Sequence, residues 1–274
     1  MKGFFMKAIL EWTWGDINNG DVGPGAFSWF HLLWLGIMIA ACVLMALTLA
    51  RKHSERTDRI VVAIFAVLLV GCEVFKQLFW FEFYGYYRLE ILPYQFCSVP
   101  IYVAIFASLV PWDKARDVCY RFLAFYGIIG GLAVMLVPTA VLYTYFISMS
   151  LHAMLWHTAL VVMGVYLIAS RGYGKNIREM IAPAVMFVCF VAVAIVGNIL
   201  VYHLHLNTPA CQPGDSLSMF YISPYYPTQI PLLGAVQEVS YPLFVLCYFL
   251  FFNGFALIVW GIALLVRKIR GKKN

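Results

Sequence analysis

One cysteine and two histidines lie at similar depths in separate apolar stretches of this sequence. Cys97 belongs to the segment LPYQFCSVP, and His152 and His157 belong to the segment SLHAMLWHTALVV. Pro93 suits the first turn of a helix, where its missing N–H would have no partner, so we expect a helix to begin there and to place Cys97 about one turn inside. A helix N-terminus and a neighbouring imidazole both favour the thiolate form of a cysteine. These residues therefore indicate a nucleophile and a general base.

Two histidines five positions apart point about 140° away from each other around a helix, so at most one of His152 and His157 is expected to meet Cys97. Other interpretations of Cys97 stay open. It can be a packing residue, or it can form a disulfide with Cys211 in a long loop, which would exclude a nucleophilic role. A metal site formed by His31, His157 and Cys97 lacks local ligand spacing, so we expect no metal and no cofactor.

Further polar side chains lie at the same end of the apolar stretches as Cys97. An ionisable residue at membrane depth costs on the order of 2.5–3.5 kcal/mol, so a group of them in one half of a bundle indicates a functional site. The alternative for Glu73 and Lys76, spaced i and i+3, is that their charges simply neutralise each other. We expect a polar cavity whose candidate supporting residues are His152, His31, Glu73, Lys76, Gln77, Gln95, Ser98 and Asn198.

The composition places these stretches in a membrane. Hydrophobic residues make up 63% of the chain, charged residues make up 12%, and the mean hydropathy is +0.84, which leaves too little polar surface for a soluble domain. A helix needs about 20 apolar residues to cross a bilayer. The sequence predicts an all-α bundle of seven transmembrane helices at about 27–50, 60–82, 95–111, 119–141, 146–170, 180–203 and 241–266.

Basic residues gather at one end of the seven predicted segments. They occupy residues 51–59, 112–121, 171–179 and the tail 267–274, whereas the opposite side carries Lys2, Lys7 and Arg88. Because cytoplasmic loops are enriched in lysine and arginine, we expect residues 1–26 outside the membrane and the C-terminal tail in the cytoplasm. The net charge of +6 then faces anionic lipid head groups, so we expect membrane lipids as partners and no nucleic acid.

One connection, residues 204–240, is long and rich in proline, tyrosine and serine. A connection of this length and aromatic content is more typical of a folded cap over the outer mouth of a bundle than of a free tether. A plain linker is the alternative.

The sequence resembles the YwaF-like family of bacterial integral membrane proteins, which has a vertebrate relative that is an ether-phospholipid acyltransferase. The resemblance is carried by His31 in FSWFHLLWLG, Glu73, Lys76, the LPYQFCS segment, FYGIIGGLAVMLVP at 125–138 and His157 in LWHTALVVMGVYLI. It covers residues 27–170 well. The resemblance implies a bacterial cytoplasmic membrane protein in which Cys97 is the nucleophile and His157 is the base of an acyl transfer.

The function that the resemblance implies is that of a lipid acyltransferase or lipid hydrolase acting on phospholipid esters. The alternative is a non-enzymatic seven-helix receptor or small transporter that uses the same polar cavity. A retinal protein is disfavoured because residues 241–266 contain no lysine for a Schiff base. A transporter would more often show repeated halves, which we do not find in the sequence.

Overall fold

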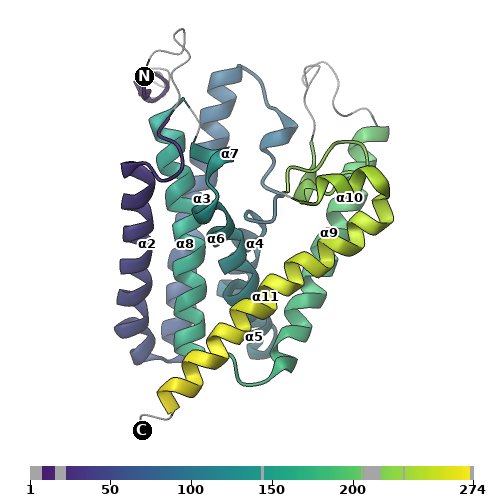
Figure 1. Ribbon diagram of the computed structural model, residues 1–274. Helices are drawn as coiled ribbons and strands as arrows, with labels where there is room; N and C mark the ends of the chain where they lie inside the picture. Colours follow the sequence, from purple (N-terminus) through teal and green to yellow (C-terminus); the bar gives the residue numbers. More distant parts are fainter. Residues whose placement is uncertain are drawn as a thin grey trace.

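The computed structural model describes residues 8–15, 23–142, 145–204, 206, 217–230 and 232–271. Figure 1 shows that the long helices form one bundle. Within the described part the regular structure is helical, apart from an isolated antiparallel bridge between Thr13 and Phe146. The helices are α2 (Trp29–Leu47), α3 (Glu55–Tyr84), α4 (Val99–Leu109), α5 (Asp113–Phe122), α6 (Ile128–Leu136), α7 (Thr139–Leu142), α8 (Ile147–Arg171), α9 (Ile181–His203), α10 (Gly234–Val239) and α11 (Tyr241–Gly271).

Six helical stretches among the described residues are long and apolar enough to cross a membrane. They coincide with six of the seven predicted segments, and α5 and α6 count as one stretch because a π-helical turn, Leu123–Gly127, joins them. The predicted segment 95–111 corresponds to α4, an apolar helix of 11 residues, which is shorter than a membrane-crossing helix. The chain is therefore an all-helical, multi-pass membrane protein.

Local sequence signals explain the ends of the two helices that carry most of the candidate residues. The Ser54 hydroxyl accepts a hydrogen bond from the Thr57 N–H at 3.0 Å and caps the first turn of α3. Gly85 ends α3 and Gly172 ends α8, with φ of 74° and 63°, in the left-handed conformation that glycine adopts without strain. These signals fix where α3 begins and where α3 and α8 end.

Helix α8 occupies the centre of the bundle. In its most apolar window 78% of the residues are buried, and in that of the α5–α6 stretch 72%, against 6% for α2. At Gly131 of α6, an added Cβ would lie 2.5 Å from the His157 carbonyl oxygen, and at Gly164 of α8 it would lie 2.4 Å from the Ile128 side chain. Glycine permits this close approach of two membrane helices. The α6–α8 contact is therefore tightly packed and positions His157.

A network of charged side chains joins the beginning of α3 to the end of α8. The fully buried carboxylate of Asp58 accepts a hydrogen bond from the Tyr166 hydroxyl at 2.7 Å, and its other oxygen lies 3.3 Å from Arg171 Nη1 and 2.9 Å from His53 Nδ1. Arg171 also pairs with Glu55. Figure 1 shows the end of α11 near this end of the bundle and the described N-terminal residues at the opposite end.

Candidate functional site

Cys97 lies in the turn that precedes α4. This helix begins at Val99, so the predicted start at Pro93 is wrong, and Cys97 lies just before the first helical turn instead of one turn inside it. The proline that occupies the first turn is Pro100, whose missing N–H needs no partner there. Pro93 belongs to the preceding loop, where its carbonyl accepts a hydrogen bond from the Tyr102 hydroxyl at 2.9 Å. Cys97 is still adjacent to the positive end of the α4 dipole.

Contacts with α6 and α8 hold the backbone of Cys97. The Trp156 indole N–H donates a hydrogen bond to the Cys97 carbonyl oxygen at 3.0 Å. Gly130 approaches so closely that an added Cβ would lie 3.3 Å from the Cys97 Cα, and the next residue, Gly131, packs on the backbone of His157. Cys97 and His157 therefore pack against consecutive glycines of α6.

His157 has one ring nitrogen engaged and one without a partner. Its Nδ1 lies 2.7 Å from the carbonyl oxygen of Ala153. Because a carbonyl oxygen only accepts hydrogen bonds, Nδ1 carries the proton of the neutral ring, and Nε2 is left as an acceptor. Nε2 is buried and has no hydrogen-bond partner in the described structure. This tautomer suits a general base, because Nε2 can take a proton from a thiol or a hydroxyl.

Charged side chains of α3 lie within electrostatic range of the Cys97 thiol. Lys76 Nζ is 2.9 Å from Glu73 Oε1, and Gln77 Nε2 donates a hydrogen bond to the same oxygen at 2.6 Å. Burial has the largest influence on the Cys97 thiol and opposes its thiolate form. Lys76 and the Ser98 side chain favour the thiolate, and Glu73 opposes it. Glu73 and Lys76 do neutralise each other as an ion pair, and they also belong to the surroundings of Cys97.

The described part of the long loop, residues 217–230, packs close to Cys97. Gln95 Nε2 donates a hydrogen bond to the Ser218 carbonyl at 3.0 Å, and Tyr221 lies within electrostatic range of Cys97. Phe220 and Tyr221 have φ of 58° and 53°, a left-handed backbone that costs about 1–3 kcal/mol for a residue other than glycine. Strained backbone of this kind is concentrated at functional sites.

A cavity of about 420 Å³ lies between this loop, the end of α3 and the chain before Cys97. Its volume is in the range of small-molecule sites. The Gln95 Oε1 is buried and has no hydrogen-bond partner in the described structure. Burial raises the pKa of Tyr221 to about 12, so the Tyr221 hydroxyl is protonated at neutral pH and can donate a hydrogen bond. The side chains lining the cavity include Trp80, Tyr84, Glu90, Gln95, Ser218 and Tyr221.

Asn198 anchors the loop to α9. Its side-chain amide donates to the Met219 carbonyl at 3.1 Å and accepts from the Met219 N–H at 2.8 Å, and the residue is 2% exposed. We expect Asn198→Ala to lower the free energy of unfolding by about 1–3 kcal/mol, because it leaves buried backbone groups without partners. Thermal unfolding of the purified protein measures this effect.

The matched control is Asn176→Ala. Asn176 is exposed and caps the short helix η5, Ile177–Met180, through one hydrogen bond from the Arg178 N–H. Water can replace that bond, so we expect a smaller loss than at Asn198. If Asn198→Ala and the wild type had the same melting temperature, the anchoring role of Asn198 would be contradicted.

The other predicted histidines have different partners. His31 is fully buried, its Nδ1 accepts a hydrogen bond from the Phe27 N–H at 2.9 Å, and its Nε2 lies 2.8 Å from the Met135 carbonyl oxygen. With both ring nitrogens engaged, His31 joins the beginning of α2 to the end of α6. His152 faces α3.

Cys97 is a free thiol, and Cys211, the partner in the alternative disulfide, lies outside the described residues. Among the described residues no three His, Cys, Asp or Glu side chains are grouped as a metal site.

Sequence reasoning did not single out Trp156 or Tyr221 as neighbours of Cys97. Trp156 directly precedes His157. A tryptophan inside a membrane helix needs a partner for its indole N–H, so its presence indicates a hydrogen-bond acceptor nearby. Tyr221 is distant from Cys97 in the sequence, and no local pattern points to it.

These features define a multi-pass helical membrane protein. The model of the TMEM164 family matches residues 26–264, and the chain belongs to this family. Comparisons with curated proteins and with solved structures give no significant match.

Proposed function

We propose that the protein is a membrane-embedded lipid acyltransferase or lipid hydrolase in which Cys97 is the nucleophile and His157 the general base. The observation that supports this most is the packing of both residues on the consecutive glycines Gly130 and Gly131, with the His157 Nε2 buried and unpartnered. The free thiol of Cys97 agrees with a nucleophilic role, and the nearby Lys76 ammonium and Ser98 side chain offset part of the effect of burial, which opposes the thiolate.

The proposed reaction has two steps. The Cys97 sulfur attacks the carbonyl carbon of a phospholipid ester while its proton passes to His157 Nε2. The carbon–oxygen bond then breaks, His157 returns the proton to the leaving oxygen, and a lysophospholipid departs from a Cys97 thioester. In the second step a hydroxyl of a lysolipid or of water attacks the thioester, and His157 takes its proton and returns it to the sulfur.

Groups around Cys97 can stabilise the negative carbonyl oxygen of the intermediates. Donors of this kind include the Ser98 hydroxyl and the protonated Tyr221 hydroxyl, whereas the backbone N–H groups of Ser98 and Val99 already bond to the Gln95 carbonyl. The cavity of about 420 Å³ beside Gln95 and Tyr221 would hold the polar head group of the lipid.

The proposal includes the orientation of the chain in a bacterial cytoplasmic membrane. α4 together with the turn before it would be the seventh crossing, with the N-terminal residues outside and the C-terminal tail in the cytoplasm. The basic loops support this orientation through the positive-inside rule. The Cys97 site would then open on the outer half of the bilayer.

The experiment that tests the function is the intact mass of the purified protein after incubation with a phospholipid of one chain type. We expect an increment of one acyl group, mapped to the Cys97 peptide, and we expect no increment in His157→Ala. An unmodified Cys97 and unchanged lipid would favour the receptor or transporter. A loss of two hydrogens that links Cys97 to Cys211 would exclude a nucleophilic Cys97.

A further inference from the structure

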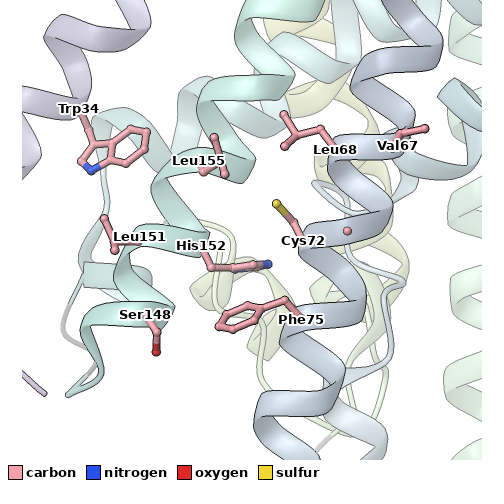
Figure 2. A pocket seen from close by; sticks show the side chains of 10 residues that line it. Trp34, Val67, Leu68, Cys72, Phe75, Ser148, Leu151, His152 and Leu155 are labelled. Atoms are coloured by element: carbon pink, nitrogen blue, oxygen red, sulfur yellow. The ribbon is translucent and has the colours of Figure 1, made fainter. Parts of the chain in front are cut away.

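A second cavity, of about 520 Å³, lies between α2, α3 and α8. Its lining is mostly apolar and includes Leu68, Phe75, Leu151 and Leu155. Figure 2 shows Trp34 and the α8 residues on one side and the α3 residues on the other, with the His152 ring extending across the gap toward Cys72. The cavity is thus apolar with few polar groups, as a site for a lipid chain requires.

The helix packing leaves this cavity open toward the membrane. α2 and α3 both pack against α8 but pack little against each other, so a gap separates them. Val67 on the α3 wall is 73% exposed, and an added Cβ at Gly71 would meet no other atom within 4 Å. In a membrane-spanning bundle an exposed apolar wall faces lipid tails. A lipid chain can therefore enter the cavity laterally, from the bilayer.

The polar groups of the cavity belong to α8. The Ser148 hydroxyl and the His152 Nε2 are both buried and have no hydrogen-bond partner in the described structure. The His152 ring also lies beside the backbone of Cys72 on α3. The Nε2 of a neutral imidazole either accepts or donates one hydrogen bond, and a hydroxyl can supply either partner.

Neighbouring aromatic rings hold the His152 ring in place. The His152 ring lies 6.1 Å from the Phe75 ring and 5.9 Å from the Trp156 ring, measured between centroids. Ser148 lies one helical turn from His152 on the same face of α8. Buried polar atoms without partners are rare in proteins and call for a ligand or water that bonds to them. A ligand that matches must supply a hydroxyl at this end and an apolar chain beyond it.

We propose that the cavity between α2, α3 and α8 binds a long-chain lipid whose hydroxyl, next to its chain, forms a hydrogen bond with His152 Nε2. Its chain would lie along Leu68, Leu155 and Trp34. A monoacylglycerol and a lysophospholipid share this chemistry. Binding rests on the cavity alone, whereas its use as the acceptor site of acyl transfer rests on the proposed function of Cys97 and His157.

Photo-crosslinking in nanodiscs tests the proposal with the full chain. The probes are a long-chain monoacylglycerol that carries a diazirine in its chain, the matching fatty-acid methyl ester without a hydroxyl, and a lysophosphatidylcholine with the same chain. We expect the two hydroxyl-bearing probes to crosslink to the α3 and α8 peptides of the cavity about tenfold more than the methyl ester, the factor that corresponds to one buried hydrogen bond. Crosslinking by only one of the two hydroxyl probes would identify which lipid is the ligand.

Two variants and a matched control distinguish crosslinking inside the cavity from crosslinking at the lipid-facing surface of the bundle. Gly71→Leu fills the cavity and should abolish crosslinking by all probes, whereas Gly254→Leu, the same change at an open position of α11, should leave it unchanged. His152→Phe keeps an aromatic ring and should remove the preference for the hydroxyl probes.

Equal crosslinking to the exposed faces of α9 and α11, or crosslinking that survives Gly71→Leu, would overturn the proposal. The test needs no turnover, and the same measurement in Cys97→Ser should give the same pattern. A wild-type protein that crosslinks but transfers no acyl group would therefore refute the proposed function and leave the cavity proposal standing. A wild-type protein that transfers acyl groups but does not crosslink in the cavity would do the reverse.

Discussion

Cys97→Ser is expected to reduce lipid turnover by at least about a thousandfold and to leave the protein folded. Removing the nucleophile of an acyl transfer leaves only the rate enhancement that comes from binding and oxyanion stabilisation. The fold should tolerate the change, because Trp156 bonds to the backbone carbonyl of Cys97 and that bond does not depend on the thiol. Release of free fatty acid or transfer of a labelled acyl chain in nanodiscs measures turnover.

The matched control is Cys189→Ser, which changes an exposed cysteine on α9. Its turnover and melting temperature should equal those of the wild type. Turnover that persists in Cys97→Ser at the wild-type rate would refute the nucleophilic role.

The two histidines of α8 should affect different steps. His157→Gln is expected to slow formation of the Cys97 thioester by about 10²–10⁴-fold, the usual contribution of a general base. His152→Phe is expected to leave thioester formation intact and to slow transfer to a hydroxyl acceptor. Single-turnover mass spectrometry, with and without an acceptor lipid, separates the two steps. An equal effect of both variants on thioester formation would contradict this division.

The membrane-spanning segments were predictable because their signal is length and apolarity, which do not depend on partners. The six long helices, including α3 and α8, follow from this signal. The beginning of α4 could not be predicted from this signal, because both Pro93 and Pro100 suit the first turn of a helix. The choice between them depends on where the loop carbonyls find hydrogen bonds, such as the bond from Tyr102 to the Pro93 carbonyl.

The sequence could indicate which residues are candidates for the site, but it could not indicate the role of each residue. The sequence places His31, His152 and His157 at similar depth, and the 140° separation of His152 and His157 around α8 agrees with their different surroundings. What distinguishes them is the partner of each ring nitrogen. His31 has both nitrogens engaged, whereas His157 has Nε2 unpartnered, and these partners are carbonyl and N–H groups of other turns that no spacing in the sequence reveals.

Asp58→Ala is expected to lower the free energy of unfolding by about 3–5 kcal/mol. This carboxylate is fully buried and is bonded to Tyr166, Arg171 and His53, so its removal leaves the Arg171 charge with fewer partners in a partly buried position. Without the Asp58 carboxylate, the beginning of α3 should be held less firmly to the end of α8. Thermal or denaturant unfolding of the purified protein measures it.

Asp113→Ala is the matched control, because Asp113 lies at the beginning of α5, is 82% exposed at its side chain and pairs with Arg116. The Arg116 side chain is buried, but it keeps its bonds to Glu55 and to the Val110 carbonyl, so this variant should lose less stability than Asp58→Ala. Tyr166→Phe removes only the neutral hydrogen bond to Asp58 and should cost about 0.5–3 kcal/mol, less than Asp58→Ala. Similar losses in Asp58→Ala and Asp113→Ala would mean that burial does not strengthen this network, and α3 would then be held to α8 by apolar packing alone.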